Sequence, residues 1–489
     1  MLDDDLHDLH DPLDMLADLN KPGRNSGHNF DLDIGSDVEI AGRVRMDLQQ
    51  AFGEIISTEG KFWRYGGTHW EDIPDHELRL VVHHYDGAMY KSASGEPSRV
   101  RLNKSRIDSI LNEMSALLTK EEFFTQDETG INCTSGFIRL DADGNPTLVA
   151  HDSNHRRRHT LPGRWHQHAL AEPPATSMLY RLLDGVFHDD DDKQEKISLL
   201  AEITGAAALG CATRLRQPRA IILKGETAEN GKSQILDLAR SLLPGNAVCS
   251  VTAGKMGDER HIVGLVGKLL NASDELSSAN AIASDTFKAI VTGEPVEGRD
   301  VYKSRVEFRP MAQHIFATNT LPVFAGGMDR GVQRRLLVIP FNRVIPQEER
   351  VEAIGRRIGE EESDLLLAWA VAGASRLIRQ KYFTMPQSSR TALNDWLFGS
   401  DPVLAWLSEQ VEITSVLDKQ ARIKTSQAYE RFRGWALGEG FNERTLPAIN
   451  AFVQRVSANS KGIEYRRTSE GRFFYGMAFA RSTPTQSRW

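Results

Sequence analysis

The sequence predicts an α/β protein of several domains whose central domain binds a nucleoside triphosphate. Three observations predict this class: a short β-branched run enters a polar loop bounded by glycines, the loop ends in Gly-Lys-Ser, and a segment with helical apolar spacing follows. A chain of 489 residues is too long for one hydrophobic core and suits about three domains.

The strand, loop and helix together form a predicted phosphate cradle. Backbone N–H groups of such a loop face an anion, and the dipole of the helix that follows favours the same negative charge. In this arrangement Lys232 reaches the β- and γ-phosphates of ATP, and the hydroxyl of Ser233 ligates Mg²⁺. The predicted ATP-binding residues are Gly225, Asn230, Gly231, Lys232 and Ser233.

The spacing of this loop departs from the usual P-loop pattern. Five residues separate Gly225 from Gly231, where the pattern has four. Either the loop is one residue longer, or Glu226 occupies the position of the first glycine. A Gly-Lys-Ser sequence also occurs by chance on surface turns, but a strand before it and a helix after it favour a nucleotide site.

An acidic pair follows an apolar run about forty residues after the loop. Asp274 is placed to hold the water shell of Mg²⁺, and Glu275 is placed to orient and deprotonate the attacking water. Most Asp-Glu pairs lie on the solvated surface of a protein and have no catalytic role. The assignment of Asp274 and Glu275 to the site therefore depends on the apolar run before them and on their distance from the loop.

Polar residues flank two further predicted strands. Asn319 ends one of them and is placed to contact the γ-phosphate or the lytic water; the alternative is a turn-forming asparagine. Arg334 and Arg335 precede the other. An arginine there fits an arginine finger, which is worth about 10³–10⁵ in rate, or a structural ion pair. The sequence does not say which arginine would act.

Four motifs lie in order in one block: 225–233, 274–275, 318–319 and 334–341. The block resembles the superfamily 3 helicases, specifically the phage and plasmid primase-helicase family related to the poxvirus helicase-primase. The resemblance implies an AAA+ core of superfamily 3 type over residues 201–390, assembled as a hexameric ring that moves on single-stranded or forked DNA, typically 3′ to 5′. It implies an ATP- and Mg²⁺-dependent replicative helicase of a phage, prophage or plasmid.

Without the resemblance, residues 296–310 predict only a basic hairpin. The resemblance also gives this hairpin a role. In the family this region lines the central channel of the ring and grips the DNA backbone. Cations bind phosphates regardless of sequence, and an aromatic ring can stack on a base; the alternative is an ordinary solvated hairpin. The expected DNA contacts are Lys303 first, then Arg299, Tyr302 and Arg305.

Two regions precede the ATPase block. Residues 1–45 are acidic and predicted to be flexible. Residues 46–200 are predicted to form a mixed α/β domain that resembles the N-terminal domain of the same family. This domain lacks a zinc ribbon and a suitable Asp-x-Asp pair, so priming is expected from a separate primase. The basic run 156–159 of this domain is expected to touch DNA or to form a surface loop. The positive charge of its arginines would repel a metal ion, which argues against a metal site at the neighbouring histidines.

Residues 395–489 are predicted to form a smaller domain in which two helices precede a basic β-hairpin. This order is the layout of a winged helix. Arg466 and Arg467 lie in the hairpin and are expected to contact DNA phosphates. Winged helices also serve as docking sites for proteins.

Composition sets the remaining expectations. The net charge of −8 does not indicate a nucleic-acid binder, but a ring helicase needs positive charge only where it meets DNA. No apolar run is long enough to span a membrane. Three scattered cysteines and the lack of a signal-like N-terminus predict a cytoplasmic protein, and the resemblance implies the cytoplasm of a bacterial host cell. Two other classes remain: a replication initiator or loader, and an AAA+ ATPase that remodels protein without processive unwinding.

Overall fold

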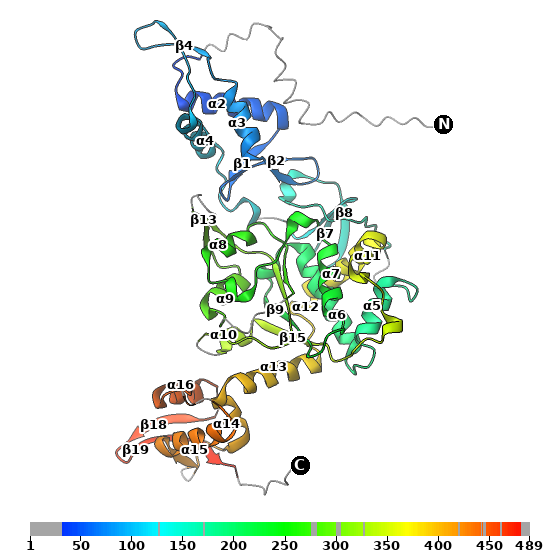
Figure 1. Cartoon of the computed structure of the whole chain (residues 1–489), viewed down its shortest axis with the longest axis vertical. Helices are drawn as coiled ribbons and strands as arrows, with labels where there is room; N and C mark the ends of the chain where they lie inside the picture. The colour runs from blue at the N-terminus through cyan, green and yellow to red at the C-terminus, as the bar shows by residue number, and fades with distance from the viewer. Residues whose placement is uncertain are drawn as a thin grey trace.

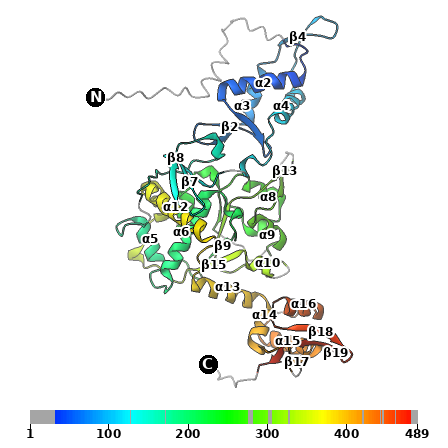
Figure 2. The ribbon, with the colours of Figure 1, turned by 180° about the vertical axis from the view of Figure 1, so that it is seen from behind.

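The computed structural model describes residues 32–125, 128–169, 172–274, 281–299, 305–325, 328–418, 421–441, 443, 446–459 and 462–480. The chain forms three units stacked along its long axis, with the largest in the middle (Figure 1). The same arrangement is seen from behind in Figure 2. Most of the acidic N-terminal region, 1–31, lies outside the described residues.

The first unit packs three helices against short antiparallel strands. The helices are α2 (Asp37–Phe52), α3 (Asp75–His83) and α4 (Lys104–Leu118), and the strands are β1 (Ile55–Thr58), β2 (Lys61–Tyr65), β3 (Trp70–Asp72), β4 (Met89–Lys91) and β5 (Pro97–Arg99). Side chains cap two of the helices, Ser36 at α2 and Asn103 at α4. This mixture of helices and strands agrees with the α/β composition predicted for residues 46–200.

A three-stranded antiparallel sheet joins this unit to the middle one. It comprises β6 (Gly130–Cys133), β7 (Gly136–Leu140) and β8 (Pro146–Val149). The sequence grouped these residues with the first unit, but Ile131, Ile138 and Trp165 pack into the core of the middle unit. Apolar spacing shows that a strand has a buried face and does not show which neighbour covers it.

The middle unit is built on a five-stranded parallel sheet in the order β10-β11-β14-β9-β15. Its strands are β10 (Val248–Cys249), β11 (Leu270–Ser273), β14 (Gln313–Thr318), β9 (Ala220–Lys224) and β15 (Leu336–Pro340). β14 and β15 are buried along their whole length, as expected for parallel strands covered on both faces. The predicted α/β class is therefore confirmed.

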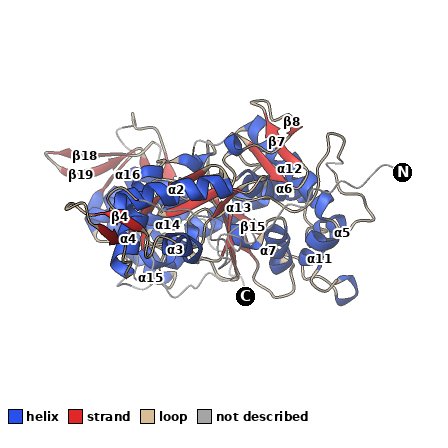
Figure 3. Cartoon of the chain, turned by 90° about the horizontal axis from the view of Figure 1, so that it is seen from above, coloured by secondary structure: helices blue, strands red, loops and turns tan. Residues whose placement is uncertain are grey.

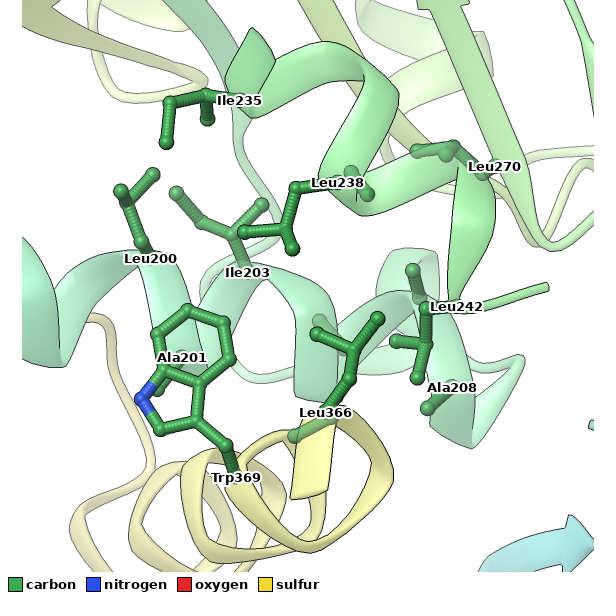
Figure 4. Close-up of a cluster of buried hydrophobic side chains, with 14 of the residues drawn as sticks. Leu200, Ala201, Ile203, Ala208, Ile235, Leu238, Leu242, Leu270, Leu366 and Trp369 are labelled. Carbon is green, nitrogen blue, oxygen red and sulfur yellow. The ribbon is translucent and has the colours of Figure 1, made fainter. Parts of the chain in front are cut away.

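Helices cover both faces of this sheet. One face meets α5 (Met178–Val186), α6 (Lys193–Leu209), α7 (Lys232–Ser241), α11 (Ile354–Glu361) and α12 (Ser363–Gln380). Trp369 of α12 packs against Leu200 and Ile203 of α6, beneath Ile235 and Leu238 of α7 (Figure 4). The other face meets α8 (Glu259–Ile262), α9 (Ser284–Val291), α10 (Arg330–Gln333) and α13 (Gln387–Ser400).

The third unit follows α13. It contains α14 (Pro402–Gln410), β16 (Val411–Ile413), β17 (Arg422–Lys424), α15 (Thr425–Gly438), α16 (Ile449–Asn459), β18 (Glu464–Thr468), β19 (Gly471–Tyr475) and β20 (Met477–Phe479). Trp406, Phe432, Phe452 and Phe474 form its core. Two helices precede the β18–β19 hairpin, as the sequence predicts, and the hairpin extends from the body (Figure 3). No described helix is both long and apolar enough to cross a membrane.

Candidate nucleotide-binding site

The glycine-bounded loop lies at the carboxyl edge of the parallel sheet. It leaves β9 after Lys224 and enters α7 at Lys232. The N–H of Gly225 donates to the carbonyl of Thr318 at 3.2 Å, so the loop starts beside the end of β14. Gly231 begins α7 with φ of +85°, a conformation that favours glycine. Ligands bind at this edge in open α/β sheets.

The ammonium group of Lys232 lies folded into the loop. Its Nζ atom donates to the carbonyl of Gly225 and to Oδ1 of Asn230, both at 3.0 Å, and lies 3.4 Å from the carbonyl of Thr227. Burial lowers the pKa of Lys232. None of the described carboxylates forms an ion pair with it. A buried cation held only by neutral oxygens would gain from an incoming anion.

The loop geometry decides between the two readings of its spacing. A Cβ atom on Gly225 would lie 2.2 Å from Nδ2 of Asn230 and 2.7 Å from Nζ of Lys232. The side chain of Glu226 instead points to solvent and pairs with Lys224 at 3.3 Å. A Cβ atom at position 225 would displace the Asn230 amide and the Lys232 ammonium from the loop, which favours Gly225 as the first glycine of a loop one residue longer than the usual pattern.

The acidic pair follows β11, two strands away from the loop in the same sheet. Ser273 pairs with Phe316 and Thr318 pairs with Lys224, so Asp274 emerges at the same edge of the sheet as the loop. Asn319 comes directly after Thr318 and is exposed. The sheet thus gathers the predicted loop residues, Asp274 and Asn319 at one edge. Glu275 lies outside the described residues.

Sequence reasoning missed Arg240, which holds Asp274. Its Nη2 donates to Oδ2 of Asp274 at 2.7 Å and to the carbonyl of Ala272 at 3.1 Å, and its Nη1 lies 3.3 Å from Oδ1 of Asp274. The side chain of Asp274 stays 54% exposed, so it can still accept further contacts. A sequence signal existed: Arg240 lies two helical turns after Lys232 on the predicted helix.

The two candidate arginines lie at the opposite edge of the sheet. They precede β15, whose Leu336 pairs with Ala220 while Pro340 pairs with Lys224. At about 3.3 Å per strand residue, the loop begins at least ~13 Å further along the sheet. Arg335 is only 9% exposed and donates to the carbonyl of Gly331 at 2.8 Å. Burial lowers the pKa of Arg335. Arg334 is exposed, so only Arg334 faces solvent.

A cleft of about 870 Å³ adjoins the loop. α5 forms one wall and residues 345–354 form the other, with Met178, Val186, Ile345, Val351 and Ile354 among the lining residues. Arg350 holds the second wall to the loop through two contacts with Glu229, at 2.6 and 2.7 Å. The volume lies within the range of small-molecule sites, and the lining combines these apolar side chains with charged ones, among them Arg181, Asp184 and Glu352.

The candidate DNA contacts are only partly described. Arg299 and Arg305 face each other in the hairpin of β12 (Val296–Arg299) and β13 (Arg305–Phe308). Arg299 is exposed, whereas Arg305 is paired with Glu297 at 3.1 Å. Tyr302 and Lys303, at the tip, lie outside the described residues.

The arginines of the C-terminal hairpin are exposed on β18. Arg466 donates through Nε to Glu464 at 2.8 Å and stacks 5.0 Å from the ring centre of Tyr475. Arg467 faces Arg472 across the hairpin. Arg467 and Arg472 thus place two positive charges side by side on the hairpin, where an anion can approach them.

The basic run 156–159 packs against other parts of the chain, with Arg158 buried, so the reading as a surface loop was wrong, and contact with DNA stays a prediction. Arg157 donates to the carbonyl of Leu209 at 2.8 Å, and Arg158 lies 3.9 Å from the ring centre of Phe124. The Nε2 atom of His159 lies 2.8 Å from the carbonyl of Gly267, and burial lowers the pKa of His159 to about 4. These side chains join the first unit to the middle one.

Fold and candidate site together define an α/β protein that presents a glycine-bounded loop at the carboxyl edge of a parallel sheet. Residues 223–335, which hold all four motifs up to Arg335, match a family described as "Family of unknown function (DUF5906)". No curated protein matches the chain.

Three similar solved structures are all of the NrS-1 C-terminal region, in its apo state. The first, an A form, has 14% identity and a TM-score of 0.45, and covers 88% of this chain and 98% of that one. The second, also an A form, has 13% identity and a TM-score of 0.42, with coverages of 90% and 100%. The third has 13% identity and a TM-score of 0.43, with coverages of 91% and 99%.

Proposed function

We propose that this chain is an ATP-dependent replicative DNA helicase of a phage, prophage or plasmid, acting in the bacterial host cytoplasm. Its motor would be a P-loop core of the AAA+, superfamily 3 type. The observation that supports this most is the buried ammonium of Lys232, which neutral oxygens hold at the mouth of the loop. A triphosphate there would replace these oxygens with charged ones.

The proposed site divides the nucleotide between two surfaces. The triphosphate lies along the loop, from Gly225 to Lys232, and the base and ribose enter the cleft between α5 and residues 345–354. Ser233 and Asp274 offer the oxygen ligands that Mg²⁺ prefers. When bound, Mg²⁺ neutralises charge that develops on the β- and γ-phosphate oxygens.

Hydrolysis then proceeds by water attack on the γ-phosphorus. The water oxygen forms the new bond, the bond from phosphorus to the β–γ bridging oxygen breaks, and ADP and inorganic phosphate result. Glu275 takes the proton of the water, and Asn319 orients the water against the γ-phosphate. Arg240 is a positioning residue in this scheme because it contacts Asp274 and not the nucleotide.

The position of the arginines supports a ring. Arg334 is exposed at the amino edge of the sheet, away from the loop of its own chain. A head-to-tail neighbour would bring it to another copy's nucleotide, and head-to-tail contacts close into rings. We take the ring as a hexamer, and Arg334 as the arginine finger in preference to the buried Arg335.

DNA would meet two parts of each copy. The tip of the β12–β13 hairpin, with Lys303, Tyr302, Arg299 and Arg305, would line the channel around a single strand. The third unit would act as a winged helix, because α14, α15 and α16 pack around the sheet β17-β19-β18. Arg466 and Arg467 would contact the phosphates of forked DNA.

Strand displacement on a forked substrate tests this function. With ATP and Mg²⁺, the full chain should release a labelled strand from a duplex with a 3′ single-stranded tail, and Lys232→Ala should release none. Hydrolysis that DNA stimulates without strand release would favour the initiator or loader. Hydrolysis indifferent to DNA would favour the remodelling ATPase. Primers made by this chain alone would contradict the expectation of a separate primase.

A further inference from the structure

The short helix α10 carries a second exposed arginine beside the proposed finger. Arg330 opens the helix and Arg334 follows it, and the N–H of Arg334 donates to the carbonyl of Arg330 at 3.2 Å. Residues four apart in a helix lie on the same face. Both side chains are exposed. The two side chains therefore leave the same face of this turn and are both open to solvent.

Two other cations close to α10 already have partners within the chain. Lys288 pairs with Asp285 at 2.8 Å and with Asp329 at 3.2 Å. Arg335 turns inward to the carbonyl of Gly331. By contrast, the side chains of Arg330 and Arg334 have no hydrogen-bond or ion-pair partner within the described ranges.

This arrangement is unfavourable for the isolated chain. Like charges four residues apart on a helix repel each other, and neither guanidinium forms an ion pair with a described carboxylate. Asp329 nevertheless fixes the helix: its Oδ1 accepts from the N–H of Val332 at 2.7 Å. The chain thus holds two adjacent cations in a capped turn that faces outward, which suits an anion supplied by another molecule.

We propose that Arg330 and Arg334 form a two-arginine clamp on the terminal phosphate of the nucleotide bound by the neighbouring copy. The inference rests on the proposed ATPase ring and adds Arg330 as a second catalytic residue. Their edge of the sheet lies at least ~13 Å from the loop of the same chain, so the phosphate must come from another copy. Two guanidinium groups spread over the γ-phosphate oxygens stabilise more charge than one.

Alanine and lysine variants test the clamp. Arg334→Ala should lower kcat at least 10³-fold, and Arg330→Ala should lower kcat about 10- to 100-fold. Arg330→Lys should show a smaller loss than Arg330→Ala. Lysine keeps the positive charge but lacks the paired N–H donors of the guanidinium group. The affinity of the isolated chain for a fluorescent ATP analogue should not change. Arg356→Ala is the matched control, since Arg356 is exposed and pairs with Glu360 in its own helix.

A mixing experiment tests action between copies. Arg330→Ala chains keep an intact loop, and Lys232→Ala chains keep intact arginines, so each supplies what the other lacks. In random mixed rings about one quarter of the sites combine both intact parts, and hydrolysis should return to roughly that fraction. A mixture that stays at the level of the Arg330→Ala protein would place Arg330 in its own chain and overturn the clamp.

The remaining outcomes separate the clamp from the proposed function. If the wild-type chain hydrolyses no ATP, both the proposed function and the two-arginine clamp are wrong. Full kcat in Arg330→Ala, with Arg334→Ala inactive, overturns only the two-arginine clamp. Loss of ring assembly by native mass spectrometry, with unchanged kcat per assembled ring, would make Arg330 an interface residue and also overturn the clamp. The thermal midpoint of Arg330→Ala should not fall, because the substitution removes a like-charge contact.

Discussion

Substituting Gly231 by alanine should weaken nucleotide binding by two separable effects. Gly231 has φ of +85° where α7 begins, and a non-glycine residue in the left-handed region costs about 1–2 kcal/mol. The new Cβ atom would also lie 2.6 Å from Cγ2 of Val186 and 3.3 Å from Cδ1 of Ile345. The backbone cost alone corresponds to a loss of about 5- to 30-fold in affinity, and the clash with α5 adds to it.

A second substitution divides the two effects. Val186→Ala removes the Cγ2 atom and leaves the backbone cost, so Gly231→Ala/Val186→Ala should bind more tightly than Gly231→Ala and less tightly than wild type. Val186→Ala alone is the reference for the small cavity that it leaves. Gly245→Ala is the matched glycine control, because a Cβ atom at Gly245 meets nothing within 4 Å and its affinity should equal that of wild type.

Titration with a fluorescent ATP analogue measures these affinities at equilibrium. The reasoning fails if Gly231→Ala binds as tightly as wild type while its thermal midpoint is unchanged. It fails in part if the double variant binds no better than Gly231→Ala, because the clash would then not lie with Val186.

Three further predictions concern other residues. Lys232→Ala should lower ATP affinity at least 100-fold, because it removes the buried ammonium group of the loop. The control is Lys224→Ala, which changes the lysine before the loop and should bind ATP as tightly as wild type. An equal loss of affinity in both variants would contradict this prediction. Arg240→Ala should raise the Mg²⁺ concentration needed for half-maximal hydrolysis about tenfold, because Asp274 loses its two contacts; an unchanged Mg²⁺ titration would remove Arg240 from the site. Burial lowers the pKa of His314 to about 4, so the neutral ring stabilises the fold above pH ~6.5 and this contribution is lost as the pH falls. At pH 5 the loss should reach about 2 kcal/mol, and His314→Asn should make the urea midpoint less sensitive to pH; equal sensitivity would refute it.

The local features of the site could be predicted from the sequence because they depend on neighbours along the chain. A β-branched run, a glycine-bounded loop and a helical period place Lys232 at a helix start without knowledge of the rest of the fold. Polar residues at the ends of apolar runs likewise indicated Asp274 and Asn319, and the structure brings both to one edge because parallel strands share that edge.

Contacts between distant segments could not be predicted in this way. The cleft needs α5 and residues 345–354, which lie far apart in the sequence. The burial of Arg158 and the contacts of the half-buried Arg157 depend on aromatic rings and carbonyls of other segments. A run of arginines has the same pattern whether it is solvated or enclosed, so charge alone suggested a surface.

The exposure of the two arginines is a similar case. Sequence order placed Arg334 and Arg335 before a buried strand but did not distinguish them. The turn of α10 points Arg335 inward, where it reaches the carbonyl of Gly331, and leaves Arg334 outside. Arg330 lay outside the motif and gained a role only from its position on the same turn.

Steady-state ATP hydrolysis by the purified full chain, with Mg²⁺ and with or without a single-stranded oligonucleotide, tests the central claim most directly. We expect turnover that the oligonucleotide increases and that Lys232→Ala abolishes. Wild-type turnover no greater than that of Lys232→Ala, with or without DNA, would contradict the account.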